Sequence, residues 1–93
     1  MKFDKDSAVA KARKDLAGRL GVSEGEIDLV RSSSKEFPDM SLGAPADGEM
    51  SAQIISNGWA IELGHGGKSY EYRGDKYQLR LRNFQGKNYL VAG

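Results

Sequence analysis

The segment ELGHGGKS, residues 62–69, contains the three residues on which a phosphate-binding loop ends: Gly67, Lys68 and Ser69. Such loops follow the pattern G-x-x-x-x-G-K-[ST] and lead into a helix whose first backbone amides hold the phosphate. In this sequence the position five before Gly67 is Glu62, and the strand-like YEY follows instead of a helix. We therefore interpret the segment as a hairpin turn and not as a nucleotide site.

The sequence contains few residues of the types that bind metals or act as catalytic nucleophiles. His65 is the only histidine and there is no cysteine, whereas a zinc site takes three or four ligands from His, Cys or carboxylate. Ser41, His65 and Asp39 provide the residue types of a nucleophilic triad, but no strand–turn–helix presents Ser41 as a nucleophile. We expect no metal, no cofactor and no enzymatic activity, and we interpret His65 as an exposed turn residue.

Nucleic-acid binding is the third chemistry to test, on the segment KYQLRLRNF. Its region contains Lys76, Arg80 and Arg82, with Tyr70, Tyr72, Tyr77 and Phe84 close in sequence. Sheets that bind single strands stack bases on exposed aromatic rings set among cations. Here the residues alternate, so we expect Tyr77, Leu79 and Leu81 to face the core while the cations face water. This pattern favours a half-buried strand protected by charge, and nucleic-acid binding by its basic face stays the third functional hypothesis.

Size and composition indicate one small domain. The chain has 93 residues and 10.2 kDa, and 14 basic against 13 acidic side chains give a net charge of +1, which favours neither a general nucleic-acid binder nor disorder. No apolar run approaches the ~20 residues of a membrane span. We expect a monomer without a membrane span. The first residues, MKFDKDSAVAKARK, lack the apolar core of a signal peptide, which with the absence of cysteine favours the cytoplasm.

One helix is predicted over residues 6–20. Its apolar residues recur at spacings of three and four and are Val9, Ala12, Leu16 and Leu20. We expect Asp6 or Ser7 to cap its first turn and Gly21 to end it in the left-handed conformation. Gly18, inside the helix, favours close packing on its face.

Strands are predicted at about residues 27–33, 50–56, 59–64, 68–73 and 76–83, with a short edge strand possible in the last residues. Asn57-Gly58 lies between two apolar runs and is the strongest hairpin signal in the chain, because both turn positions of such a hairpin need φ > 0. The predicted fold is therefore α+β: an N-terminal helix packed on a four- to five-stranded antiparallel meander sheet.

A long loop, residues 35–50, separates the first two predicted strands. Its sequence KEFPDMSLGAPADGEM contains both prolines of the chain and shows neither helical nor strand periodicity. Loops longer than ~12 residues are usually functional or disordered, and a stiffened loop loses less entropy on binding. The alternative is that the loop only caps one end of the core, with Phe37 and Leu42 turned inward.

Residues 36–75 also resemble an uncharacterised family of small bacterial and archaeal proteins, many of them secreted or lipoproteins. The family signature runs approximately W-P-D-x-C-L-G-x-P-x-x-G-x-x-C-A-Q-V-I-T-x-G-Y-x-I-x-L, followed by G-x-x-Y-x-Y. The matching residues are Pro38, Asp39, Leu42, Gly43, Pro45, Gly48, Ala52, Gln53, Tyr70 and Tyr72. With the helix, the resemblance covers about residues 8–75. It implies a location in the cell envelope or outside the cell. A weaker likeness links the chain to PepSY-type domains.

The sequence departs from this signature at two positions: Ser41 and Ser51 occupy the places at which many members carry the two cysteines. The resemblance thus implies a loop closed by packing instead of a disulfide, with the Cα atoms of the two serines within roughly 7 Å. Either the protein works where thiols stay reduced, or the two cysteines were replaced. Both remain open.

Two further functions follow. The first is a non-enzymatic protein-binding module, peptidase-inhibitor-like, whose partner is another protein or a peptidase. Its candidate binding residues are Phe37, Pro38, Asp39, Met40, Ser41, Leu42 and Pro45. The alternative is a small ligand-binding protein or enzyme that uses a polar cluster of Asp39, Ser41 and Gln53, and this alternative needs a concave pocket.

Overall fold

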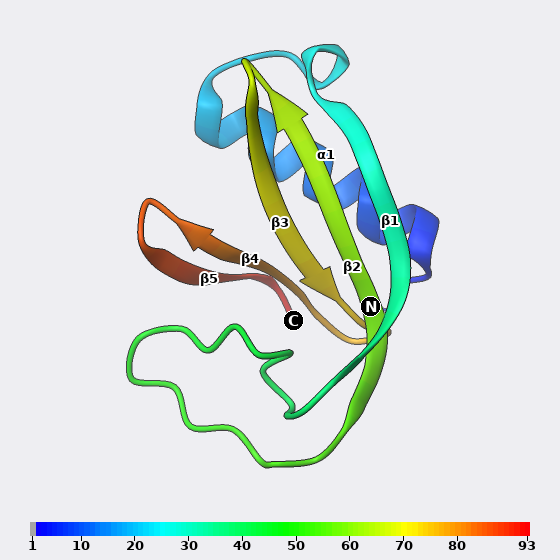
Figure 1. Cartoon of the computed structure of the whole chain (residues 1–93), viewed down its shortest axis with the longest axis vertical. Helices are drawn as coiled ribbons and strands as arrows, with labels where there is room; N and C mark the ends of the chain where they lie inside the picture. The colour runs from blue at the N-terminus through cyan, green and yellow to red at the C-terminus, as the bar shows by residue number, and fades with distance from the viewer. Residues whose placement is uncertain (1) are drawn as a thin grey trace.

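The computed structural model describes residues 2–93 and shows one antiparallel sheet with a helix across one face (Figure 1). The elements are α1 (Lys5–Leu20), the short 3₁₀ helix η1 (Glu24–Glu26), β1 (Asp28–Phe37), β2 (Ser56–His65), β3 (Lys68–Gly74), β4 (Leu79–Phe84) and β5 (Lys87–Ala92). The strands lie in the order β1-β2-β3-β4-β5, which is also their order in the sequence. The predicted α+β meander is confirmed. No helix within residues 2–93 is long and apolar enough to cross a membrane.

Helix α1 begins one residue earlier than predicted because its cap is Asp4. The Asp4 carboxylate accepts from the Ser7 backbone N–H at 2.8 Å, and the Ser7 hydroxyl accepts from the Asp4 N–H at 3.0 Å. Asp6 and Ser7 therefore lie inside the helix. Gly21 ends it at φ 69°, as predicted. Gly18 is exposed, and a Cβ built there would meet nothing within 4 Å, so the expected close packing at Gly18 was wrong.

The core lies between α1 and the sheet. The helix contributes Ala8, Ala12, Leu16 and Ala17, and the sheet contributes Ile61, Leu63, Tyr72, Leu79 and Leu81, all buried. Tyr72 is the largest of them, and its hydroxyl donates to the Asp15 carboxylate at 2.7 Å. Burial of the ring, together with this bond, raises the pKa of the Tyr72 hydroxyl. The one polar group among these core residues is thus satisfied by the helix that covers it.

The predicted hairpin at Asn57-Gly58 is wrong. Residues 50–55 form no strand, and both residues lie inside β2, which starts at Ser56. Strand β1 continues to Phe37, so pairs such as Lys35 with Gly58 and Phe37 with Ser56 form one ladder. This ladder decides the conformation, because it pairs the residues of the expected turn with β1. The connection between β1 and β2 is thus residues 38–55, and not 35–50.

Gly58 is required by a close contact instead. It has no positive φ, but a Cβ at this position would overlap the carbonyl oxygen of Gly74, at the end of β3. The glycine therefore lets the backbones of β2 and β3 approach each other.

The predicted strand 76–83 starts later, at Leu79, and Tyr77 is 62% exposed instead of facing the core. The Asp75 carboxylate accepts from the backbone N–H groups of Tyr77 and Gln78, at 2.8 and 3.0 Å. These bonds form a turn that removes Tyr77 from the strand and breaks the alternation expected there. Leu79 and Leu81 are buried as predicted. The last residues do form an edge strand, β5.

Candidate functional site

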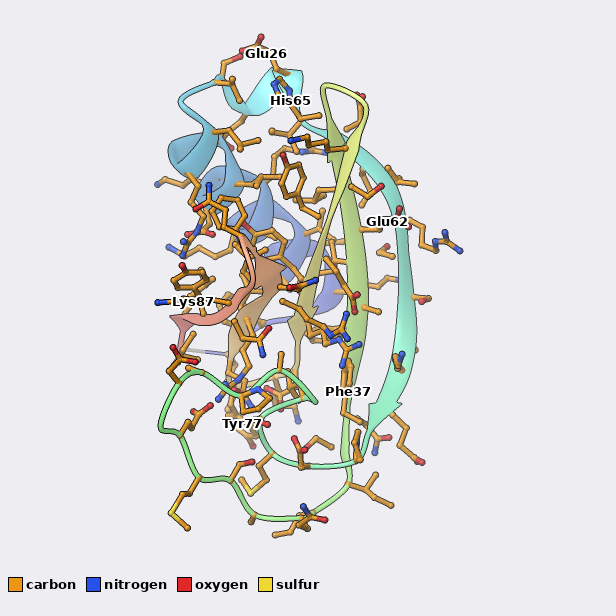
Figure 2. All side chains as sticks on the ribbon, turned by 60° about the vertical axis from the view of Figure 1, so that its left-hand side comes forward. Glu26, Phe37, Glu62, His65, Tyr77 and Lys87 are labelled. Carbon is orange, nitrogen blue, oxygen red and sulfur yellow. The ribbon has the colours of Figure 1, made fainter. Side chains whose placement is uncertain are left out.

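The sheet has a second face, turned away from α1, which we call the outer face. Figure 2 shows residues 38–55 at the end of the molecule where Phe37 and Tyr77 lie. There the loop packs on the outer face and is held by side chains from β3, β4 and β5. The long loop is therefore a second layer on the sheet.

A tight turn at Asp39 begins the loop. One oxygen of its carboxylate accepts from the Ser41 hydroxyl at 2.7 Å, the Ser41 N–H at 2.9 Å and the Gly43 N–H at 3.0 Å. These bonds stabilise the charged form, so the Ser41 hydroxyl first, then the Gly43 amide, lowers the pKa of Asp39. Leu42 and Gly43 follow in the left-handed region, at φ 59° and 67°. The turn directs Leu42 toward the sheet.

The buried side chains of this region are Phe37, Ser41, Leu42 and Ala44. The guanidinium of Arg73, from β3, lies 5.3 Å from the centre of the Phe37 ring. Its Nη1 also donates to the Leu42 carbonyl at 2.8 Å. The inward orientation predicted for Phe37 and Leu42 is confirmed, and Arg73 joins the two to the sheet.

Four side chains that follow the loop in sequence donate to loop carbonyls. The bonds are Gln78 to Met40 at 2.6 Å, Arg73 to Leu42 at 2.8 Å, Arg80 to Ala44 at 3.1 Å and Asn88 to Pro45 at 2.9 Å. They satisfy backbone acceptors that a loop without regular structure cannot pair internally. The sheet therefore holds the loop from outside, in addition to the bonds within the loop itself.

Arg80 makes the strongest of these attachments. Its Nη1 and Nη2 donate to the two carboxylate oxygens of Glu49 at 2.5 and 2.7 Å, and its side chain is only 5% exposed. The expectation that Arg80 faces water was wrong, because the loop covers that part of the outer face. The Arg80 guanidinium beside it, with the Ala46 N–H, lowers the pKa of Glu49 to about 2.

This pair predicts a pH dependence. Because the pKa of Glu49 is about 2 in the folded protein and about 4.5 ordinarily, its contribution to stability is fully present above pH 4.5 and is lost as the pH falls toward 2. Unfolding by denaturant, measured for the wild type and Glu49→Gln between about pH 2 and about pH 7, should give a stability difference that narrows below pH 4.5. Asp47→Asn is the control, since Asp47 is 86% exposed and lies 3.9 Å from Lys87. A difference that is constant over the whole range would contradict the prediction.

The fixed loop presents apolar side chains to solvent. We define the loop-end patch by its members, which are Met40, Met50, Ile54, Ile55 and Tyr77, 48–96% exposed. Two contacts place Met40 beside the segments that carry the other members: the Met40 N–H donates to the Ala52 carbonyl at 3.0 Å, and the Met40 carbonyl accepts from Gln78, which follows Tyr77. Clusters of exposed large apolar residues mark binding surfaces more often than single ones do.

The predicted loop residues fall into two groups. Phe37, Ser41 and Leu42 are buried and position the loop, whereas Pro38, Met40 and Pro45 are exposed and Asp39 is half-buried. Gln53 is exposed and makes no side-chain hydrogen bond within residues 2–93. One carboxylate oxygen of Asp39, together with the Ser41 hydroxyl and the Ser41 and Gly43 amides, forms the turn.

Sequence reasoning missed Met50, Ile54, Ile55 and Tyr77. The first three were assigned to a strand at 50–56 and Tyr77 to the core, so their apolar character was explained by burial. The signal that could have found Tyr77 is Asp75-Lys76-Tyr77, where an Asx turn competes with the start of the strand, and no such signal precedes the other three.

The two serines at the cysteine positions of the resembled signature lie on facing arms of the loop. The bond from the Met40 N–H to the Ala52 carbonyl joins the residues next to them. Ser41 is buried and Ser51 is exposed. The loop is closed here by this bond and by the Asp39 turn, and the Cα separation of Ser41 and Ser51 stays a prediction.

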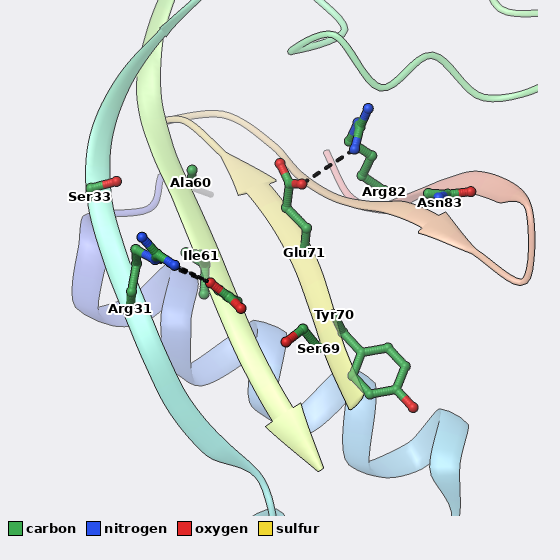
Figure 3. A pocket seen from close by; sticks show the side chains of 10 residues that line it. Arg31, Ser33, Ala60, Ile61, Ser69, Tyr70, Glu71, Arg82 and Asn83 are labelled. Carbon is green, nitrogen blue, oxygen red and sulfur yellow. Dashed lines mark hydrogen bonds and ion pairs between the residues drawn. The ribbon is translucent and has the colours of Figure 1, made fainter. Parts of the chain in front are cut away.

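A shallow polar cavity of about 430 Å³ lies beyond the loop on the outer face (Figure 3). It lies between two ion pairs, Arg31 with Glu62 at 3.0 Å and Arg82 with Glu71 at 3.4 Å. Each glutamate thus pairs with an arginine on the neighbouring strand. The cavity is lined by neither Asp39, Ser41 nor Gln53, so the polar cluster and this concavity are separate places.

The remaining candidates are also engaged in contacts. His65 is half-buried at the end of β2, and its Nδ1 lies 3.1 Å from the Glu26 carbonyl oxygen, so it is not a free turn residue (Figure 2). Arg80 and Arg82 are each paired with a carboxylate. Within residues 2–93, no group of three or more His, Cys, Asp or Glu side chains is placed to hold a metal ion.

Comparison with known families gives one match: the model of a domain of unknown function (DUF8738) matches residues 9–82. No curated protein and no solved structure matches the chain. The matched range runs from α1 into β4, so it contains the loop and most of the residues that hold it. It agrees with the expectation of an uncharacterised family and does not support the likeness to PepSY-type domains.

Proposed function

Since the chain belongs to this family of unknown function, DUF8738, we propose from its own geometry that it is a protein-binding module that docks through the loop-end patch. The observation that carries the proposal is a loop attached to the sheet through residues 40–49, followed by a segment whose exposed side chains are apolar. Met50 is 96% exposed, and Ile54 and Ile55 are more than half exposed, next to an attachment that buries Arg80. Exposing these apolar side chains to water is unfavourable in free energy, and a partner that covers them removes this cost.

The attachment supports binding as much as folding. A loop that is already ordered loses little conformational entropy when a partner covers it. Here the Asp39 turn, the buried Leu42 and the Arg80–Glu49 pair order the loop before any contact is made. Met residues at the surface adapt their shape to a partner, which suits Met40 and Met50 to a contact surface.

A peptidase-inhibitor-like role is the finer form of the proposal. It is supported by an extended, proline-containing loop held on a small sheet, since a rigid loop can occupy a peptidase cleft without being ordered by it. The polar cluster of Asp39, Ser41 and Gln53 is a less favoured proposal, because one oxygen of the Asp39 carboxylate already accepts three hydrogen bonds from its own turn.

A loop-end variant tests the proposal: Met50→Ser, Ile54→Ser and Ile55→Ser together. We expect proteins captured from the natural host by the wild type to be retained about tenfold less by this variant, and inhibition in a panel of peptidases to weaken by a similar factor. Val30→Ser is the matched control, because Val30 is 53% exposed near the start of β1, at the end of that strand away from the loop. Equal capture and inhibition by the wild type and the loop-end variant, with both folded, would remove the patch from the function.

A further inference from the structure

Strand β1 differs from the rest of the sheet in its exposure. It has ten residues and lies at the end of the strand order, so within residues 2–93 no strand pairs with its outer edge. Helix α1 packs mainly on β2, β3 and β4 (Figure 1). As a result, eight of the ten residues of β1 are exposed, on both faces of the sheet.

Free edges are usually blunted by short strands, prolines, bulges or charged side chains. β1 has one irregularity, between Leu29 and Arg31, but residues 31–37 pair regularly with β2. This regular stretch leaves an unpaired row of backbone N–H and C=O groups, which is what an added strand requires. The other edge strand, β5, is shorter and has two irregularities in its pairing.

The outer face of this edge is cationic. Arg31, Ser33 and Lys35 point to this face, since they pair with Glu62, Ala60 and Gly58. The Arg31 side chain is 70% exposed and contacts one oxygen of Glu62. Lys35 makes no ion pair among the described residues and lies 6.0 Å from the Phe37 ring centre. An added strand would place its own side chains about 5 Å from these cations.

The opposite face of the same edge is hollow. Between Ser34, Glu36, Asn57 and Trp59 lies a concavity of about 360 Å³. Trp59 is half-buried and packs against the core, and its partner across the strands is Ser34, a short side chain. An apolar side chain from an added strand would fill this concavity and remove apolar surface from water.

We propose that the outer edge of β1 accepts an extended peptide strand from a partner protein, with acidic side chains opposite Arg31 and Lys35 and apolar side chains opposite Ser32 and Ser34. The backbone bonds supply affinity, and the two faces select the side chains. This surface is separate from the loop-end patch, so the two proposals stand or fall independently.

A second copy of the chain fits this edge less well. When two copies pair antiparallel about a two-fold axis, their outer faces lie on the same side of the joined sheet. Arg31 and Lys35 of one copy then lie close to Arg31 and Lys35 of the other. With the axis at Ser33, Arg31 faces Lys35 directly, and with the axis at Ser34 the two Lys35 side chains are diagonal neighbours. Like charges opposite one another destabilise a pair of strands.

The test uses a blocked peptide with the core Glu-Leu-Thr-Leu-Glu, which reads the same in both directions and so fits a parallel or an antiparallel strand. Titration of the ¹⁵N-labelled protein should shift the backbone amides of residues 31–37 and slow the hydrogen exchange of those on the outer edge. The Arg31→Glu and Lys35→Glu double variant should bind this peptide about tenfold more weakly and should prefer the Lys-Leu-Thr-Leu-Lys peptide.

Arg82→Glu is the control, because it reverses one charge on the outer face but on β4, away from the edge. It should bind like the wild type. Three results would overturn the proposal: equal binding of the two peptides by the wild type, amide shifts confined to other strands or to the loop-end patch, or sedimentation that shows dimers of the free protein formed through β1.

Discussion

Replacing Arg80 by methionine is expected to lower the free energy of unfolding by about 3 kcal/mol, because it leaves the Glu49 carboxylate and the Ala44 carbonyl without their donor. Methionine keeps much of the apolar stem, so the loss reports mainly on the guanidinium. Chemical denaturation measures the loss, and amide exchange locates it. We expect faster exchange at Ala44 and Ala46, whose N–H groups are bonded within the loop.

The control for this prediction is Arg82→Met on the same strand. The Arg82 side chain is 44% exposed and lies 3.4 Å from Glu71, and exposed pairs of this kind contribute about 0.5 kcal/mol or less. A second variant, Arg80→Met with Glu49→Met, removes both charges. It should lose less stability than the sum of the two single changes. Equal losses for Arg80→Met and Arg82→Met would show that the loop is not held by Arg80.

Replacing Gly58 by alanine is expected to lower the free energy of unfolding by about 3 kcal/mol or to prevent folding, because the new Cβ overlaps the Gly74 carbonyl oxygen. The backbones must move apart, since neither partner is a flexible side chain. The loss would spread to the packing of β2 on β3. Thermal and chemical unfolding of the variant measure it.

Gly86→Ala distinguishes the cost of a steric overlap, as at Gly58, from the cost of backbone strain at a positive φ. Gly86 has φ 83° and open space around its Cβ position, so alanine there costs about 1–2 kcal/mol through backbone strain alone. Asn57→Ala should be nearly neutral, because Asn57 is an exposed strand residue. If Asn57→Ala and Gly58→Ala both cost about 1 kcal/mol, the hairpin turn predicted from the sequence would be the better description of this segment.

The elements that sequence reasoning predicted correctly are those with local causes. Leu16 and its neighbours form a stripe that needs only helical geometry, and Gly21 ends the helix through its own φ. The alternation of Leu79 and Leu81 correctly predicted which face of β4 packs into the core. The α+β class follows from these patterns, since an amphipathic helix and half-buried strands must cover one another.

The candidate site was predictable only in part. The burial of Phe37 and Leu42 was expected, and so was a long segment without regular structure between the first two strands. The roles of Arg73 and Arg80 were not, because a cation in an alternating strand indicates a wet face unless another segment covers it. The loop that covers Arg80 lies more than thirty residues earlier in the chain.

The sequence by itself determined the helix, the core face of the sheet and the presence of a special segment between the first two strands, because short-range spacing specifies each of them. Tertiary structure decided that Asn57-Gly58 lies within a strand, that the loop docks on the outer face, and that Met50, Ile54, Ile55 and Tyr77 point to solvent. The physical reason is that strand pairing and the capture of loop carbonyls by Arg73, Gln78, Arg80 and Asn88 join residues far apart in the chain. No local pattern carries that information.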